Sequence, residues 1–312
     1  MKPPILITGS HRSGKSYTVK GINLYNNFNI IHEPLNVNTT MGWTGLDIEH
    51  YYTYIDESNS DKFRKAYSRT FNNYNYRLLK QLRKTSIGDL SGVVKDFANS
   101  LRYRLNRKRA LIDDPFAIFS AEWFYREFNS DIIIMIRHPA SFAASLKLLK
   151  YNFPFSHLLN QKNLVEKKLG RFEPKLIEYA DRNPDIVKQS VLLWRMIYDT
   201  VKQYRDEYGN NWFFMRFEDI ARKPEIYFEK IYYYLHLPVH PASLRNIRHN
   251  IRTIKSTPDK ELGILTNLHG GEYSVEDHLM SYKKILTEDE INYVKEKAHD
   301  VWQHFYSEDD WE

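Results

Sequence analysis

A glycine-rich segment near the start of the sequence restricts the fold more than any other feature. Gly9–Ser16 reads GSHRSGKS and matches the phosphate-loop pattern GxxxxGK(S/T) at every fixed position. The apolar run Ile5–Thr8 precedes it and a helical pattern follows over residues 17–25, which is the strand–loop–helix context that the pattern requires. Gly9 and Gly14 allow backbone geometry that strains other residues, so successive amides can surround an anion at the start of the helix. The residues predicted to contact this anion are Ser10, His11, Arg12, Ser13, Gly14, Lys15, Ser16 and Tyr17.

Four more apolar runs read as buried strands, and helical patterns separate them. Their apolar residues are continuous instead of alternating, which is typical of strands that helices cover on both faces. The sequence therefore predicts an α/β fold of the P-loop type, with a parallel β-sheet of about five strands flanked by helices. Glu33, Asp113 and Arg137 follow the ends of three of these strands, where parallel sheets bind ligands. The expected strands cover residues 5–8, 29–32, 110–112, 131–136 and 212–215.

We expect a single domain over residues 1–312, because no repeat, low-complexity tract or clear linker interrupts the chain. Two stretches, 35–108 and 150–184, exceed what the sheet needs. Both read as helical insertions over the active face, where an acceptor substrate would bind.

Composition narrows the class of protein only slightly. The net charge of +6 and the pI of about 9.1 suit an anionic ligand without identifying it. The chain has no cysteine, which excludes a disulfide framework and thiol chemistry. No run approaches the roughly 20 apolar residues that span a bilayer, and the N-terminus shows no signal-peptide pattern. We expect a cytoplasmic protein without a transmembrane segment and without a nucleic-acid partner.

A second anion site is predicted after the fourth strand. Arg137 ends that strand, and Ser145 lies two turns into the helix that we expect to begin near Pro139. An arginine fork and a hydroxyl can hold a phosphate together. The spacing is equally compatible with a structural arginine at the sheet and a helix serine that faces solvent.

The phosphate loop alone leaves the chemistry open. In an ATPase or kinase, Ser16 would bind Mg²⁺ next to Lys15, and Asp113 would complete the metal site. A nucleotide-binding or polyanion-binding protein without catalytic activity is a further hypothesis.

Taken together, several motifs make the sequence similar to the sulfotransferases that use 3′-phosphoadenosine 5′-phosphosulfate (PAPS), particularly their bacterial carbohydrate-type branch. Gly9–Gly14 resembles the family's 5′-phosphosulfate loop, and Ile136–Leu146 resembles its 3′-phosphate motif. Trp194, Arg216–Asp219 and Pro224 resemble a conserved later helix and strand-turn-helix, and Ser281–Lys284 is a looser match to the segment that closes over the nucleotide.

This resemblance implies a PAPS-dependent sulfotransferase that acts on a hydroxyl-bearing acceptor, in particular a carbohydrate, without a metal. It places Arg12 at the transferring sulfate and the bridging oxygen, where Arg12 and Lys15 would stabilise the leaving group. Two positions depart from the family pattern: many members have Thr where this chain has Lys15, and Lys where it has Asp113. The implied nucleotide contacts are Gly14, Lys15 and Ser16 for the 5′-phosphate, Arg137 and Ser145 for the 3′-phosphate, and Ser281 and Lys283 as further contacts.

The acceptor hydroxyl needs a general base, and Glu33 is our candidate because it lies at the end of the second strand. His32 is the adjacent alternative, and strand alternation predicts that only one of the two side chains faces the site. A charged residue in a strand-end turn before Pro34 is the structural alternative for Glu33.

Overall fold

The structure is a computed structural model, and it describes residues 2–26, 28–38, 44–72, 108–182, 184–239 and 275–312. Part of the predicted insertion 35–108, namely residues 39–43 and 73–107, lies outside the described residues. Among the described residues, no helix is both long and apolar enough to cross a membrane.

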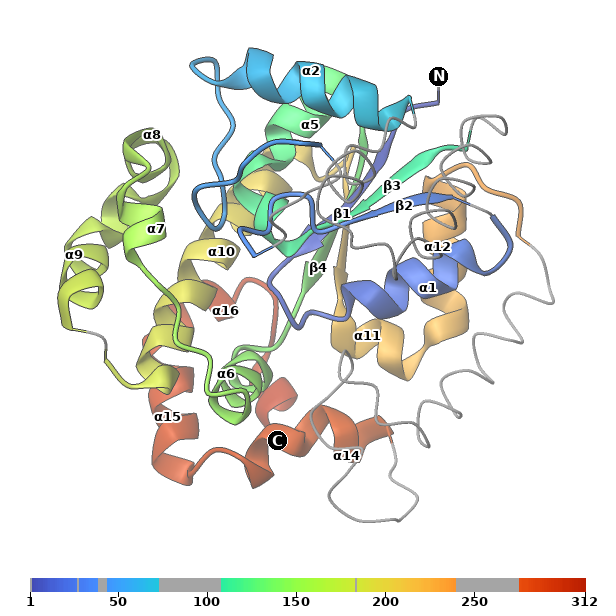
Figure 1. Cartoon of the computed structure of the whole chain (residues 1–312). Coiled ribbons are helices and arrows are strands. Elements are labelled where there is room, and N and C mark those ends of the chain that lie inside the picture. Colours follow the sequence, from blue (N-terminus) through green and yellow to red (C-terminus); the bar gives the residue numbers. More distant parts are fainter. Residues whose placement is uncertain (1, 27, 39–43, 73–107, 183, 240–274) are drawn as a thin grey trace, which may run out of the picture. The chain divides into compact units, whose positions relative to one another are not determined.

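The described strands form a five-stranded parallel sheet in the order β2-β3-β1-β4-β5 (Figure 1). The predicted α/β fold with its parallel sheet is thereby confirmed. β1 and β3 are buried along their whole length, as their continuous apolar runs indicate. The order reverses at β1, because the chain adds β2 and β3 on one side of it before β4 and β5 on the other. Ligands of parallel sheets bind at such a reversal, here the loops after β1 and β4. The strands are β1 (Ile5–Gly9), β2 (Asn29–His32), β3 (Ala110–Asp113), β4 (Asp131–Ile136) and β5 (Phe213–Arg216).

The chain divides into two compact units, each built from separate stretches of sequence. The first comprises residues 1–8 and 27–132. Its helices pack through aromatic side chains: Tyr67 meets Phe124 edge-on at 4.9 Å between ring centroids, and Trp123 donates a hydrogen bond to Ser60 Oγ at 2.8 Å. This aromatic face explains why the apolar residues of α2 recur at helical spacing. The helices of this unit are α2 (Ser60–Phe71), the 3₁₀ helix η2 (Pro115–Ser120) and α5 (Ala121–Phe128).

The second unit comprises residues 9–26 and 133–312 and contains the phosphate loop. Its longest helix, α10, begins after Asp185, whose carboxylate accepts a hydrogen bond from Lys188 N–H at 3.0 Å and caps the helix. Trp194 and Tyr198 on α10 are fully buried. The helices of this unit are α1 (Lys15–Asn26), α6 (Pro139–Leu148), α7 (Ser156–Leu159), α8 (Lys162–Leu164), η3 (Val165–Leu169), η4 (Gly170–Phe172), α9 (Glu173–Arg182), α10 (Ile186–Tyr208), α11 (Phe217–Arg222), α12 (Pro224–Tyr234), α14 (Val275–Leu279), η5 (Met280–Lys284), α15 (Glu288–Lys297), α16 (His299–Trp302) and η6 (Glu308–Trp311).

Helices α7, α8 and α9 fall within the predicted insertion 150–184, and α2 falls within 35–108. That these segments bind the acceptor, and that residues 1–312 act as one domain, stay predictions.

Candidate active site

The phosphate loop depends on its two glycines. Gly9 has φ +145° and Gly14 has φ +83°, values that favour glycine. A methyl group added at Gly9 would lie 2.2 Å from the carbonyl oxygen of Met135. Between the glycines, Arg12 adopts φ +66°, a left-handed conformation that costs a non-glycine residue about 1–2 kcal/mol. Strained residues of this kind gather at functional sites, which marks Arg12 as a candidate ligand contact.

Within the loop, hydrogen bonds converge on one carbonyl group. The main-chain oxygen of Ser10 accepts bonds from Ser13 Oγ at 2.6 Å and from Lys15 Nζ at 3.3 Å. Thr18 N–H donates the first bond of α1, to Gly14 O at 3.1 Å. The amides of the three residues before Thr18 therefore point out of the helix end, where they attract an anion.

Two residues predicted to contact the nucleotide, His11 and Tyr17, have side chains that pack against other aromatic rings. His11 packs against Phe142 and Tyr151, and burial, together with the nearby charges of Lys15 and Arg12, lowers its pKa to about 3. The imidazole is therefore neutral at pH 7, and the positive charge of the loop comes from Arg12 and Lys15. Tyr17 turns its ring toward Phe228 of α12, at 5.6 Å between centroids, as part of the core.

The loop touches the second predicted anion site directly. Arg12 Nε donates a hydrogen bond to Ser145 Oγ at 3.1 Å, although 133 residues separate the two positions. Ser145 lies on α6 and is buried, so it is not a helix serine that faces solvent. The structure therefore brings together two side chains that the sequence assigned to opposite ends of one ligand.

Arg137 is a buried cation with a defined orientation. Its side chain is 6% exposed, and its guanidinium carbon lies 4.2 Å from the centroid of the Phe217 ring. Its Nε lies 3.6 Å from Glu218 Oε1, which is an ion pair but longer than a hydrogen bond. Among the described residues, this buried Nε has no hydrogen-bond partner. Buried polar atoms are normally satisfied, so an orphaned guanidinium nitrogen indicates a ligand site.

Helix α10 holds the backbone of Arg137 from two positions. Trp194 Nε1 donates to Arg137 O at 2.8 Å, and Arg137 N–H donates to Tyr198 Oη at 2.9 Å. Tyr198 Oη also lies 2.9 Å from Ser10 Oγ. One buried hydroxyl therefore connects the phosphate loop to the end of β4.

Phe217 makes a further connection between the two sites. A methyl group added at Gly14 would lie 2.0 Å from Phe217 Cδ2, so the ring is packed directly on the glycine backbone. The guanidinium of Arg137 lies over the same ring. Any displacement of the loop at Gly14 would therefore move Arg137.

The two later residues of the predicted nucleotide site behave differently from each other. Ser281 is buried in η5. Lys283 is exposed, and its Nζ donates to the main-chain oxygen of Glu312. Their contact with the nucleotide stays a prediction.

In the first unit, three side chains gather where β2 and β3 end. His32 Nδ1 lies 3.2 Å from Asp113 Oδ2, and the two residues pair in the register of the sheet. Glu33 follows in a left-handed conformation, with φ +43°, and its Oε2 accepts a hydrogen bond from Asn36 Nδ2 at 2.6 Å. Because this φ turns the chain, alternation along the strand does not extend to Glu33.

The two acidic residues at the end of β3 have different partners. Asp113 pairs with His32, whereas the buried Asp114 accepts the amides of Leu35 at 2.7 Å and Phe116 at 2.8 Å. Asp114 thereby caps η2. In the part of the chain that the structure describes, no group of three or more His, Asp or Glu residues could hold a metal ion.

Comparison with known proteins identifies the fold. No family model matches the chain, and no curated protein matches it by sequence. The sulfotransferase domain of the olefin synthase of Synechococcus PCC 7002 matches with a TM-score of 0.50 and 12% identity, over 98% of this chain and 95% of that one. The sulfotransferase domain from the curacin biosynthetic pathway matches with a TM-score of 0.51 and 13% identity, over 97% of each chain. The chain has the sulfotransferase fold.

Three residues of this sulfotransferase fold have contacts that sequence reasoning did not anticipate: Tyr198, Phe217 and Glu218. The Arg216–Asp219 segment stood out in the sequence, but without a role for any side chain. Tyr198 lies one turn after Trp194 on α10, and that spacing was the only signal for it.

Proposed function

We propose that this chain transfers the sulfuryl group of PAPS to an acceptor hydroxyl, with a carbohydrate as the acceptor class. The observation that carries the proposal is the Arg12–Ser145 hydrogen bond, which links the phosphate loop to helix α6. It joins the phosphate loop to the buried Ser145 of the predicted 3′-phosphate site, within a sulfotransferase fold. A ligand with anionic groups at both its 5′ and 3′ positions matches this arrangement better than a nucleoside triphosphate, whose anionic groups form one linear chain.

The donors present suit such a ligand. Arg12, Lys15 and the amides at the start of α1 would hold the 5′-phosphosulfate, since helix ends and cationic side chains favour anions. Arg137 offers a planar fork and Ser145 a hydroxyl for the 3′-phosphate. That group distinguishes PAPS from ATP, so Arg137 is the residue on which the proposal depends most.

In the proposed reaction the acceptor oxygen attacks sulfur while the bond from sulfur to the 5′-phosphate oxygen breaks. The electron pair of that bond goes to the leaving bisphosphate, where Arg12 and Lys15 stabilise the developing charge. The acceptor proton goes to the carboxylate of Glu33. We expect no metal in this step, because the loop's cations and amides meet the electrostatic demand of in-line transfer.

Changing Glu33 to glutamine tests the base assignment. We expect loss of transfer by about 10²–10⁴-fold, the usual contribution of general base catalysis, with unchanged affinity for 3′,5′-bisphosphoadenosine. Transfer is measured with sulfur-labelled PAPS on a panel of neutral and acidic glycans. Glu57→Gln, an exposed carboxylate in the same unit, is the matched control.

A parallel variant, His32→Gln, decides between the adjacent candidates. If it abolishes transfer while Glu33→Gln retains full activity, the base is the His32–Asp113 pair, and Glu33 only shapes the turn. If no hydroxyl compound accepts labelled sulfur from PAPS, the proposed activity is wrong.

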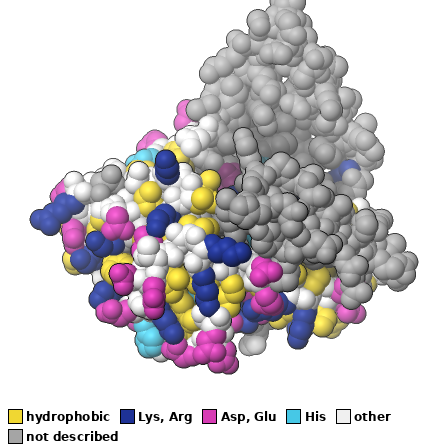
Figure 2. Space-filling view, turned by 90° about the horizontal axis from the view of Figure 1, so that it is seen from below, with side chains coloured by type: hydrophobic (Ala, Val, Ile, Leu, Met, Phe, Trp, Pro, Cys, Tyr) yellow, Lys and Arg dark blue, Asp and Glu magenta, His cyan; other side chains and the backbone are white. Residues whose placement is uncertain are grey.

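The described residues carry surface charges of both signs. On the face seen in Figure 2, Lys and Arg side chains of the described residues are interspersed with Asp and Glu side chains. Polyanions bind best to extended surfaces of one sign.

A further inference from the structure

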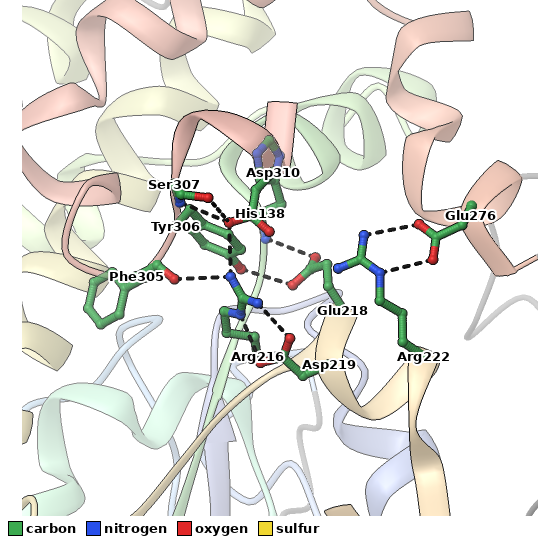
Figure 3. A network of polar contacts seen from close by, with 10 residues as sticks. All are labelled: His138, Arg216, Glu218, Asp219, Arg222, Glu276, Phe305, Tyr306, Ser307 and Asp310. Carbon is green, nitrogen blue, oxygen red and sulfur yellow. Dashed lines mark hydrogen bonds and ion pairs between the residues drawn. The ribbon is translucent and has the colours of Figure 1, made fainter. Parts of the chain in front are cut away.

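Glu218, on α11, is a buried carboxylate beside the candidate 3′-phosphate site, and both of its oxygens have fixed partners. Oε1 accepts a hydrogen bond from His138 N–H at 3.1 Å, and Oε2 accepts one from Tyr306 Oη at 2.9 Å (Figure 3). Oε1 also lies 3.6 Å from Arg137 Nε. The side chain is 7% exposed. Burying a charge this deeply costs free energy unless its partners are well placed, so we expect Glu218 to have a specific role.

The partner on the far side, Tyr306, is a dependable donor. Burial, and then the negative charge of Glu218, raises the pKa of Tyr306 well above its ordinary value. The phenol therefore stays protonated at any physiological pH and keeps donating to Oε2. The carboxylate cannot rotate without breaking a hydrogen bond at one of its ends.

A rigid turn near the end of the chain holds Tyr306 in place. Arg216 makes two hydrogen bonds to Asp219, at 2.8 and 2.6 Å, and one to Asp310 at 3.0 Å. Asp310 Oδ2 also accepts from Ser307 N–H at 2.8 Å, which closes the turn after Tyr306 (Figure 3).

The ring of His138 fills the space beneath this turn. It stacks on Tyr282 at 5.4 Å and meets Tyr306 and Trp311 edge-on at 5.0 and 4.4 Å. Burial, and then the charge of Arg137, lowers the pKa of His138 well below its ordinary value, so its ring is neutral. His138 therefore adds packing and its backbone N–H to this region, and Arg137 remains the charge beside Glu218.

We infer that Glu218 is a positioning residue that orients Arg137 for the 3′-phosphate, an inference that rests on the proposed function. Glu218 forms an ion pair with the Nε edge of the guanidinium, and the ring of Phe217 lies against its plane. An arginine held in this way has its two terminal nitrogens as the donors for a phosphate. Its flexible side chain is already ordered, so less rotamer entropy is lost when the ligand binds.

The negative charge of Glu218 has the opposite effect, because it repels a phosphate. The orienting effect of Glu218 on Arg137 outweighs this repulsion of the phosphate. Neutralising Glu218 therefore tests the inference. Affinity for the 3′-phosphate falls if orientation dominates and rises if repulsion dominates.

The experiment measures dissociation constants for 3′,5′-bisphosphoadenosine and for adenosine 5′-monophosphate on each variant. The ratio of the monophosphate dissociation constant to the bisphosphate dissociation constant isolates the contribution of the 3′-phosphate, and a general loss of folded protein does not change it. For Glu218→Gln we expect this ratio to fall about tenfold, the lower range for residues that orient a ligand-binding side chain, while monophosphate affinity stays the same. Tyr306→Phe, which removes one hydrogen bond and keeps the packing, should lower the ratio by about two- to threefold, in line with a smaller loss of orientation.

Two controls complete the design. Glu276→Gln neutralises a carboxylate that pairs with Arg222 at the surface, and it should leave the ratio unchanged. In an Arg137→Ala background, Glu218→Gln should have no further effect on the ratio, because Glu218 acts through Arg137.

The outcomes distinguish a failure of the positioning role of Glu218 from a failure of the proposed function. An unchanged or higher ratio in Glu218→Gln, with Arg137→Ala still lowering it, overturns the positioning role and leaves the proposed function standing. A ratio near one in the unaltered protein overturns both.

Discussion

Replacing Arg137 with alanine is expected to weaken binding of 3′,5′-bisphosphoadenosine by roughly 100-fold or more, since two charge-assisted hydrogen bonds are lost. Affinity for adenosine 5′-monophosphate should change little, because the phosphate loop stays intact. Titration calorimetry of both nucleotides on the purified variant measures this difference. Glu218 keeps the His138 N–H and Tyr306 hydroxyl bonds, so its charge is not left without partners and the variant should fold.

Arg222→Ala is the matched control, because Arg222 is another arginine of the same unit whose partner, Glu276, lies at the surface. It should bind both nucleotides as the unaltered protein does. Equal losses for bisphosphate and monophosphate in Arg137→Ala would show that Arg137 does not contact a 3′-phosphate. Arg137→Lys should give an intermediate loss of bisphosphate affinity, since lysine keeps the charge but lacks the planar fork.

Replacing Gly14 with alanine is expected to abolish binding of both nucleotides, a pattern that differs from the selective loss at Arg137. The residue has φ +83°, and the added methyl would lie 2.0 Å from Phe217 Cδ2. The loop must move, and a shift of about 1 Å in a binding site can cost about 100-fold. We also expect the free energy of unfolding to fall by roughly 2–4 kcal/mol, from backbone strain plus overpacking.

Gly170→Ala is the control for the Gly14 variant. A methyl group there would meet the carbonyl oxygen of Val165 at an ordinary 3.6 Å, and its φ is −51°. Urea unfolding should give a stability within about 1 kcal/mol of the unaltered protein, as is usual for a tolerated glycine change. If Gly14→Ala binds the bisphosphate normally, the loop is not the phosphate site.

The strands could be predicted because each consists of a continuous apolar run that a polar or proline-containing segment ends. Asp131–Ile136 is the clearest case, and β4 has those bounds. The two compact units, each assembled from separate stretches of sequence, could not be foreseen, because no linker or shift in composition marks their limits.

For the candidate site, the sequence predicted the two halves but not the hydrogen bond between them. The loop and the Arg137–Ser145 pair carry local patterns, whereas the Arg12–Ser145 bond depends on tertiary structure. Phe217 and Glu218 contact Arg137 from 80 and 81 residues further along the chain, and no periodicity records such contacts. Tyr17 shows a further limit: its place after the loop predicts a nucleotide contact, and its ring packs in the core, which leaves its backbone amide for such a contact.

The most direct test of the central claim is a calorimetric competition on the unaltered protein. It compares 3′,5′-bisphosphoadenosine with ATP, each with and without Mg²⁺. We predict that the bisphosphate binds more tightly than ATP and that Mg²⁺ does not improve its binding, because Arg137, Arg12 and Lys15 would supply the counter-charge. Tighter binding of ATP that requires Mg²⁺ would contradict the account and assign the phosphate loop to a kinase or hydrolase.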